Sequence, residues 1–181
     1  MSRWDDAGRR QGTDKSSLGH GYLRHYETIL GSRIVTAVLE IGVDEGRSLL
    51  LRSDLWPDAD VWGIETRRDA PLLDMRDCAV LFGDATTPET IAELPERAWD
   101  LVVDDGSHQF PDQAATMALL APLLGPRGVY VVEDVPWSDT LASTDTIQNI
   151  LAAMAVHGLR PLAVAFSALR QHAAIIGERL S

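Results

Sequence analysis

The sequence predicts a single α/β domain built on a mostly parallel β-sheet. Short runs of β-branched and aliphatic residues alternate along the chain with longer amphipathic segments, which is the pattern of repeated β-α units. These apolar runs are continuous, as expected for strands that are covered on both faces. With 181 residues, of which 45% are hydrophobic and 24% charged, the chain has the size and composition of one globular domain.

Five apolar runs are predicted to form the parallel strands, at residues 36–41, 60–64, 79–82, 101–104 and 129–133. Helices are expected between them, at residues 47–53, 88–93 and 111–124. Pro111 suits a first helical turn, and Gly125 with Pro126 ends that helix. A further helix is indicated because apolar residues recur at helical spacing over residues 147–154, before Gly158.

The end of the sequence has a different pattern. Residues 161–167 and 173–177 are two strand-like runs, and residues 168–172 between them are predicted to form the turn of an antiparallel hairpin. There is no internal repeat or interdomain linker in the sequence, so we expect residues 1–181 to form one domain. Residues 1–11 are mostly polar, and we expect them to be disordered.

The formal net charge of −11 excludes several classes of partner. An acidic surface repels phosphate backbones and anionic lipid, so we expect no nucleic-acid or membrane partner. No apolar stretch reaches the length of a membrane span, and the first residues lack the apolar core of a signal peptide. The single cysteine, Cys78, excludes an intramolecular disulfide. We therefore expect a cytoplasmic protein.

A glycine turn follows the first predicted strand and leads into the next helix. Gly42 and Gly46 allow a ligand to approach the backbone closely, and Glu40 and Ser48 flank them. The spacing differs from the GxGxxG pattern of pyrophosphate-binding turns. Acidic residues in this turn suit a sulfonium or amino group better than a diphosphate. The turn is a candidate binding site for a nucleoside cofactor.

Further candidate cofactor residues follow the next strands. Glu65 ends the second strand, where a carboxylate can accept hydrogen bonds from ribose hydroxyls. Asp84 and Ala85 follow the third strand, where Asp84 can receive an adenine amino group, and Asp104 ends the fourth. Thr13, before the first strand, is either within reach of the cofactor or part of a solvated turn. Each acid could instead cap a helix, but acidic strand ends at one sheet edge favour a nucleoside site.

The most informative motif is an acidic turn after a predicted buried strand. Residues 104–108 read Asp-Asp-Gly-Ser-His, and Glu133 and Asp134 end the next strand. Those strands are expected to be neighbours, which brings Asp105, Glu133 and Asp134 to the crevice at their carboxyl ends. Adjacent carboxylates are unfavourable unless a cation neutralises them or some are protonated. Oxygen ligands with open positions suit Mg²⁺ and leave room for a substrate hydroxyl.

His108 follows Asp105 by three residues and is a candidate general base. A hydroxyl beside a metal ion is more acidic, and a nearby imidazole can take its proton. The alternative is that this segment is a plain turn, that the carboxylates are solvated, and that His108 is an ordinary loop histidine. Two acidic clusters at the same sheet edge favour the metal site.

Six short motifs together resemble one family: GTDK at 12–15, HGY at 20–22, YE at 26–27, LEIGV at 39–43, DDGSH at 104–108 and VED at 132–134. The family is that of metal-dependent O-methyltransferases of natural-product sugars, which includes the mycinamicin-sugar and calicheamicin rhamnosyl methyltransferases and neighbours the cephalosporin-hydroxylase-like proteins. The similarity extends over residues 12–177. It implies a Rossmann-like class I methyltransferase fold with a seven-stranded, mostly parallel sheet and a C-terminal antiparallel hairpin.

The resemblance also implies a site. In the family, the second Asp of DDGSH and both acids of the ED motif hold magnesium, and these positions are Asp105, Glu133 and Asp134 here. The motif's histidine, the proposed base, is His108. The cofactors implied are S-adenosyl-L-methionine and Mg²⁺. Several relatives have an additional N-terminal region that helps to close the active site, whereas this chain starts almost at the shared motif, so we expect a homo-oligomer.

The sequence thus predicts an S-adenosylmethionine- and Mg²⁺-dependent O-methyltransferase, and a sugar hydroxyl on a secondary metabolite is the leading acceptor. A catechol-type O-methyltransferase acting on an aromatic diol has the same metal chemistry and stays an alternative. A nicotinamide-dependent oxidoreductase is disfavoured because the GxGxxG pattern is missing. The intact acidic motifs and His108 argue against a non-catalytic binding protein.

Overall fold

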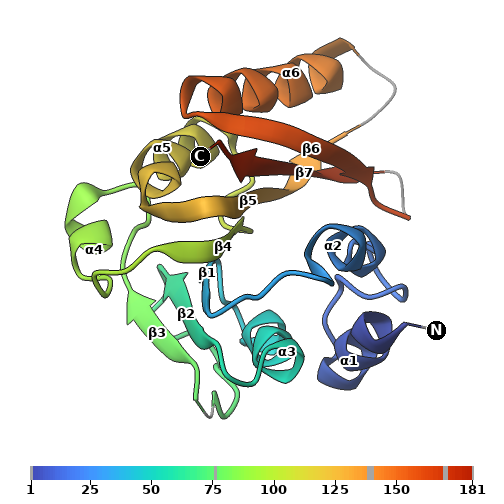
Figure 1. Cartoon of the computed structure of the whole chain (residues 1–181), viewed down its shortest axis with the longest axis vertical. Helices are drawn as coiled ribbons and strands as arrows, with labels where there is room; N and C mark the ends of the chain where they lie inside the picture. Colours follow the sequence, from blue (N-terminus) through green and yellow to red (C-terminus); the bar gives the residue numbers. More distant parts are fainter. Residues whose placement is uncertain (1, 76, 138–140, 169–170, 181) are drawn as a thin grey trace.

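A mixed β-sheet runs through the centre of the molecule (Figure 1). The computed structural model describes residues 2–75, 77–137, 141–168 and 171–180, with only the backbone described for 141–143. In these parts the strands are β1 (Ala37–Ile41), β2 (Asp60–Glu65), β3 (Ala79–Phe82), β4 (Trp99–Asp104), β5 (Leu124–Pro136), β6 (Leu159–Phe166) and β7 (His172–Arg179). Their order is β3-β2-β1-β4-β5-β7-β6. β7 is antiparallel to both its neighbours, and the pairs among β1 to β5 are parallel.

This sheet confirms the predicted fold class, with five parallel strands and a terminal antiparallel hairpin. Several boundaries differ by a few residues, among them the end of one helix. The helix predicted for residues 111–124 ends at Leu120 and is followed by one 3₁₀ turn, Ala121–Leu123. β5 then begins at Leu124, because Leu124 already pairs with Trp99 of β4.

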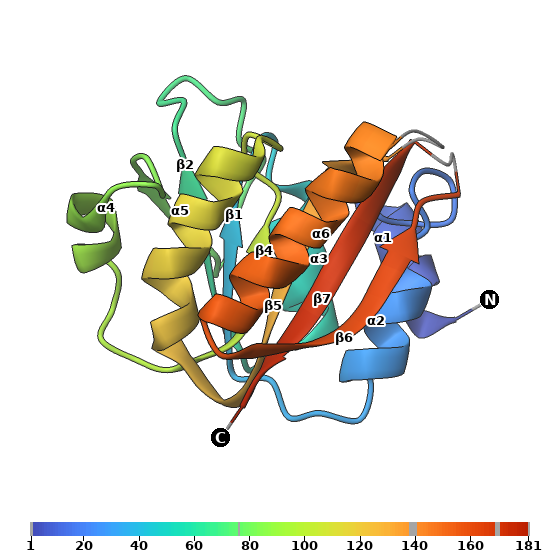
Figure 2. The same ribbon diagram turned by 90° about the horizontal axis from the view of Figure 1, so that it is seen from above.

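The helices are α1 (Arg3–Gln11), α2 (Leu23–Leu30), α3 (Arg47–Leu55), α4 (Pro88–Ala92), α5 (Phe110–Leu120) and α6 (Leu141–Val156). α1, α2 and α3 cover one face of the sheet, and α5 and α6 cover the other (Figure 2). The molecule therefore has three layers. As far as the chain is described, it contains no helix long and apolar enough to cross a bilayer.

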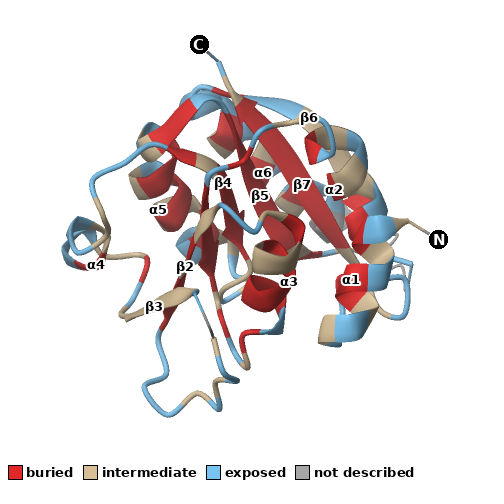
Figure 3. Ribbon diagram, turned by 60° about the horizontal axis from the view of Figure 1, so that its bottom comes forward, coloured by how far each residue is buried: buried red, intermediate tan, exposed pale blue. Residues whose placement is uncertain are grey.

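The central strands are buried on both faces, as the continuous apolar runs predicted (Figure 3). Successive side chains of a strand point to opposite faces. Val38 of β1 and Val103 of β4 pack under α1, α2 and α3. Their sequence neighbours Leu39 and Val102 pack under α5 and α6. Both faces of the sheet thus contribute to the hydrophobic core.

The first residues differ from our expectation of disorder. Residues 3–11 form α1, and Met1 lies outside the described residues. The Ser2 side chain caps the helix by accepting a hydrogen bond from the backbone N–H of Asp5. Trp4 and Ala7 are buried, and the Trp4 ring lies 5.2 Å from that of Trp56 in an edge-to-face arrangement. The helix is ordered because its apolar side packs on α3, a tertiary contact that the local sequence does not show.

Candidate functional site

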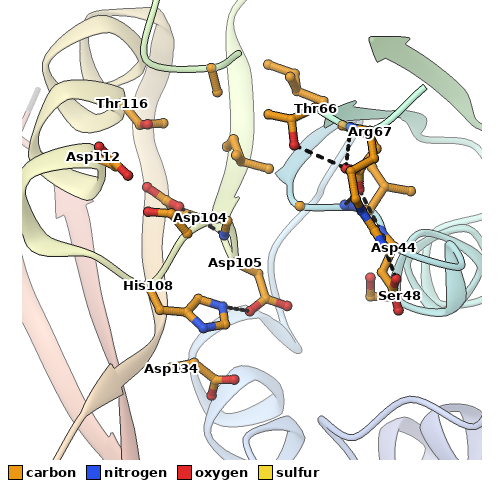
Figure 4. Close-up of a pocket in the computed structure, with 18 of the residues that line it drawn as sticks. Asp44, Ser48, Thr66, Arg67, Asp104, Asp105, His108, Asp112, Thr116 and Asp134 are labelled. Carbon is orange, nitrogen blue, oxygen red and sulfur yellow. Dashed lines mark hydrogen bonds and ion pairs between the residues drawn. The ribbon is translucent and has the colours of Figure 1, made fainter. Parts of the chain in front are cut away.

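A cavity of about 730 Å³ opens at the carboxyl ends of β1, β2 and β4 (Figure 4). This volume is within the range of small-molecule binding sites. Most of the predicted residues line it, namely Thr13, Gly42, Ser48, Glu65, Asp84, Ala85, Asp104, Asp105, His108 and Asp134. Glu40, Gly46 and Glu133 are not among the lining residues. The parallel register aligns Ile41 with Asp104 and Asp104 with Val132, so the acidic strand ends meet at this edge.

The glycine turn forms one wall of the cavity. Gly42 and Gly46 have φ values of +83° and +87°, in the left-handed region that favours glycine. A Cβ atom at Gly42 would overlap the backbone carbonyl of Asp105, and one at Gly46 would overlap the sulfur of Met75. Gly42 is therefore required by the packing of the turn, and Gly46 by its backbone conformation.

Glu65 lies at the base of the cavity in a fixed position. Its Oε2 accepts hydrogen bonds from the backbone N–H groups of Val43 (3.1 Å) and Asp44 (2.9 Å). Its Oε1 accepts one from the N–H of Arg67 at 2.9 Å. Burial opposes the charge of Glu65, but these hydrogen bonds lower its pKa. Glu65 is thus an ionised and rigidly held acceptor, as a ribose-binding carboxylate needs to be.

Glu40 has a different position from the one we expected. Its side chain is fully buried behind the cavity wall and accepts a hydrogen bond from the Ser48 hydroxyl. Its Oε2 lies 3.5 Å from Nε of Arg52, which is also fully buried. Glu40 therefore holds α3 against β1, and Ser48 is the member of this pair that lines the cavity.

Asp84 and Ala85 form the adjacent part of the wall. The Oδ1 atom of Asp84 accepts hydrogen bonds from the backbone N–H of Thr86 at 2.9 Å and from its hydroxyl at 2.7 Å, and these bonds lower the pKa of Asp84. Ala85 is buried, as is Thr13, which also lines the cavity. Asp84 thus stabilises a turn and lines the cavity at the same time.

Asp104 is almost completely buried at the end of β4. Burial raises its pKa to about 7, although hydrogen bonds from the Gly106 N–H and the Tyr130 hydroxyl partly oppose this. Asp104 therefore carries a proton over much of the acidic and neutral pH range, and can donate as well as accept a hydrogen bond in the cavity.

Asp105, His108 and Asp134 form the acidic end of the cavity (Figure 4). One donor atom of each lies within 4.8 Å of one donor atom of the other two. Nε2 of His108 is 3.3 Å from Oδ1 of Asp105, although the contact lacks the alignment of a good hydrogen bond. Asp105 raises the pKa of His108. The Tyr22 hydroxyl donates to Oδ1 of Asp134 at 3.0 Å and so orients that carboxylate.

Lys15 also lines the cavity and contacts the carboxylates of Asp105 and Glu133. Its Nζ is 2.5 Å from Oδ2 of Asp105 and 2.7 Å from Oε2 of Glu133, and its side chain is only 3% exposed. Burial alone would lower the pKa of Lys15, but the two carboxylates reverse this and raise it. The ammonium in turn holds the pKa of Asp105 well below its usual value against the effect of burial. Lys15 is thus an internal cation shared by two of the three predicted metal ligands.

Glu133 is the predicted metal ligand whose placement differs from expectation. It is buried, and its Oε1 accepts a hydrogen bond from the Tyr26 hydroxyl. The same Oε1 lies 3.9 Å from Nη2 of Arg52. Burial raises the pKa of Glu133. The structure therefore places Asp105 and Asp134 at the cavity surface and Glu133 beneath it. Two carboxylates suffice for Mg²⁺, which usually keeps several water ligands.

Comparison with known sequences gives relatives of one kind, and no family model matches the chain. Mycinamicin VI 2''-O-methyltransferase of Micromonospora griseorubida is 28% identical over 123 residues, which are 63% of this chain and 30% of that protein. The 8-demethyl-8-alpha-L-rhamnosyl tetracenomycin-C 2'-O-methyltransferase of Streptomyces olivaceus is 32% identical over 141 residues, which are 71% of this chain and 36% of that protein. The matches thus span about a third of each curated relative.

Comparison with solved structures decides the fold. MycE methyltransferase from the mycinamycin biosynthetic pathway, in complex with Mg, SAH and mycinamycin VI, superposes with a TM-score of 0.78 at 20% identity, over 99% of this chain and 54% of that one. Aeropyrum pernix fibrillarin with natively bound S-adenosyl-L-methionine gives a TM-score of 0.67 at 21% identity, over 78% of this chain and 66% of that one. The chain has the class I methyltransferase fold.

Several residues of this methyltransferase fold were not predicted as part of the site. Lys15, Tyr22 and Tyr26 belong to the shared motifs but were given no role at the metal site, and Arg52 was given none. One signal was available, because Lys15 is the single lysine among the 16 basic residues of the chain. Residues after β2 and on α5 that also line the cavity were missed, namely Thr66, Arg67, Asp112 and Thr116 (Figure 4).

Proposed function

We propose that the chain is an S-adenosylmethionine- and Mg²⁺-dependent O-methyltransferase that methylates a sugar hydroxyl of a secondary metabolite. The observation that carries this proposal is that one cavity joins the glycine turn and Glu65 to the cluster of Asp105, His108 and Asp134. The names of the curated relatives, which are O-methyltransferases of glycosylated natural products, support the class of acceptor.

The proposed cofactor site follows from the wall of the cavity. S-adenosylmethionine supplies a methyl group on a positively charged sulfur. Glu65 would accept hydrogen bonds from the ribose hydroxyls, and Asp84 with Ala85 would contact the adenine. Gly42 allows the close approach of the ligand, and Thr13, Ser48 and Asp104 line the remaining wall. Fixing the donor and the acceptor in one cavity is the main contribution of the protein to the rate.

The proposed metal site lies at the acidic end. Asp105 and Asp134 would hold Mg²⁺, whose positive charge makes a neighbouring hydroxyl more acidic. Glu133 stays the third ligand proposed from the sequence. The metal would have to compete for its carboxylate with the ammonium of Lys15, which contacts it. His108 would accept the hydroxyl proton at Nδ1, because its Nε2 faces Asp105. Asp105 would thus orient the base as well as bind the metal.

The test is methyl transfer from labelled S-adenosylmethionine to a panel of glycosides and catechols. We expect methylated glycosides, loss of turnover in EDTA and recovery with Mg²⁺. Calorimetric titration of S-adenosylmethionine, with and without Mg²⁺, separates cofactor binding from catalysis. Full activity in EDTA would contradict the metal site, and methylation restricted to catechols would replace the proposed acceptor by the alternative one.

A further inference from the structure

Asp134 also belongs to a second group of side chains that have suitable donor atoms for a metal ion. His20, Asp134 and His172 each place one donor atom within 4.8 Å of one donor atom of the other two, and we refer to these residues as the histidine cluster. Nε2 of His20 is 3.7 Å from Oδ2 of Asp134. The rings of His20 and His172 are 5.4 Å apart between centroids. The function proposed above uses neither histidine.

The backbone holds the histidine cluster in place. The carbonyl of His20 accepts a hydrogen bond from the N–H of Ala168 at 2.8 Å, and the carbonyl of His172 accepts one from Ser167 at 2.9 Å. The imidazole of His20 stacks on the ring of Tyr22 at 5.2 Å, with an interplanar angle of 9°. The cluster thus joins the segment between α1 and α2, the end of β5 and the start of β7 in one position.

The two imidazoles have unused binding capacity. Nδ1 of His20 and Nδ1 of His172 are both buried and have no hydrogen-bond partner in the described part of the structure. A buried nitrogen without a partner is unfavourable, and native structures contain few of them. A cation bound beside Asp134 would use one nitrogen lone pair of each neutral imidazole, and the nitrogen of His20 that faces Asp134 is Nε2. Around them the charge is negative, because Asp14 Oδ2 also lies 3.6 Å from His20 Nε2.

We propose that His20, His172 and Asp134 bind a divalent transition-metal ion of the Zn²⁺ class. Two imidazoles and one carboxylate favour such ions, whereas Mg²⁺ prefers ligands that are all oxygen. Donors around one zinc ion lie roughly 3–3.5 Å apart, given bonds of about 2.0–2.1 Å, so small side-chain rotations close the site. The proposal does not depend on methyl transfer, although the cluster shares Asp134 with the proposed Mg²⁺ site.

The experiment is a titration of the full chain with Zn²⁺ by calorimetry, and with Co²⁺ by visible absorption. Both are done without Mg²⁺, because Mg²⁺ at the site proposed above would occupy the shared Asp134. We expect His172→Gln and His20→Gln each to weaken Zn²⁺ binding by about tenfold or more, since loss of even an outer-shell partner costs about 10–100-fold. His25→Gln is the matched control, because His25 lies on α2 outside the cluster, and we expect it to bind as the native chain does.

His108→Gln distinguishes the two clusters that share Asp134. Zn²⁺ binding that is lost in His108→Gln and kept in His172→Gln would overturn the proposal, as would a native chain that binds no Zn²⁺. Circular dichroism shows whether each variant is folded, and if His172→Gln is not, His20→Gln decides alone. The visible bands of Co²⁺ report a site with four or five ligands, so a native chain whose spectrum equals that of aqueous Co²⁺ would also overturn it. None of these outcomes alters the test of methyl transfer.

Discussion

Lys15 balances the carboxylates of Asp105 and Glu133, and its removal gives the sharpest prediction at the scale of one residue. Lys15→Met leaves the buried Glu133 and the partly buried Asp105 without their shared cation. Removing one partner of a buried ion pair typically costs about 3–5 kcal/mol, and we expect a loss of that size in the free energy of unfolding. Urea denaturation without divalent ions measures it.

The same variant tests whether the metal and Lys15 compete for these oxygens. If they do, Mg²⁺ will stabilise Lys15→Met more than it stabilises the native chain. Arg24→Met, at an exposed position of α2, is the control and is expected to change stability by about 0.5 kcal/mol or less. Equal stabilisation of both proteins by Mg²⁺ would show that Lys15 and the metal act at separate places.

His108 gives a prediction for the pH dependence of the rate. As a general base, His108 is active when neutral, so the rate is expected to rise with pH through its pKa. Asp105 raises that pKa and a bound Mg²⁺ would lower it, so the rise should be centred near the usual value of about 6.5. His108→Ala should lower turnover by about 10²–10⁴-fold and abolish this pH dependence. His157→Ala, after the end of α6, should leave both unchanged, and a pH profile that survives in His108→Ala would refute the assignment.

Asp104 gives a prediction for stability. Its pKa is about 7 in the folded chain and near 3.8 when exposed, so the folded state holds the extra proton between these values. Stability therefore falls as pH rises from about 4 to 7, by up to roughly 4 kcal/mol at 1.36 kcal/mol per pKa unit. The amide of Asp104→Asn does not ionise, so the stability of this variant should not show that fall. The free energy of unfolding of the variant relative to that of the native chain should therefore increase between pH 5 and pH 8. Parallel pH curves from urea denaturation would contradict the raised pKa.

The residues that sequence reasoning found and missed differ in one physical respect. Asp105, His108 and Asp134 follow strands directly, so the register of a parallel sheet brings them together once the strands are identified. Lys15 and Tyr22 instead lie in the segment between α1 and α2, whose position depends on tertiary packing. No local sequence pattern predicts which face of the sheet that segment lies against.

At the scale of elements, the expected disorder of residues 1–11 was wrong, because residues 3–11 form α1. The contribution of this helix to stability can be measured. Trp4 is buried against Trp56, and replacing a buried tryptophan by alanine typically costs about 3–5 kcal/mol. We expect Trp4→Ala to lower the free energy of unfolding by about that amount. Ile34→Ala is the control, because Ile34 is 88% exposed. If both variants unfold at the same urea concentration, α1 contributes little to the stability of the domain.

The strands were predictable because each is a short apolar run between turn residues. The end of α5 was not, since the alanine and leucine residues around position 121 suit a helix and only the pairing of Leu124 with Trp99 selects the strand. The position of Glu40 could not be predicted from the sequence either. A carboxylate beside a glycine turn resembles a ligand contact, but the buried Arg52 that pairs with it is twelve residues further along the chain.

For the whole molecule, ligand binding should appear as thermal stabilisation. S-adenosylmethionine at about 100 times its dissociation constant should add about 2.7 kcal/mol, which for a chain of this size raises the melting temperature by about 5–10 °C. NAD⁺ at the same concentration is the control, because it represents the oxidoreductase alternative. A larger shift with NAD⁺ would reverse the choice of cofactor.

The expectation of no nucleic-acid partner stays a prediction at this scale. The net charge of −11 argues against binding to a phosphate backbone. The fold itself does not decide the matter, because a fibrillarin from Methanococcus jannaschii, described as a pre-rRNA processing protein, has a TM-score of 0.68 to this chain at 16% identity. A gel-shift assay at low salt would measure the affinity for RNA.

The position of β7 has a consequence for synthesis on the ribosome. β6 is made before β7, yet it joins the sheet only through β7, which lies between β5 and β6. While the chain emerges, β1 to β5 can pair in the order of their synthesis, but β5 keeps an open hydrogen-bonding edge and β6 has no partner. Open strand edges promote aggregation. The interval before residues 172–179 leave the exit tunnel is therefore the period in which a nascent chain most needs a chaperone.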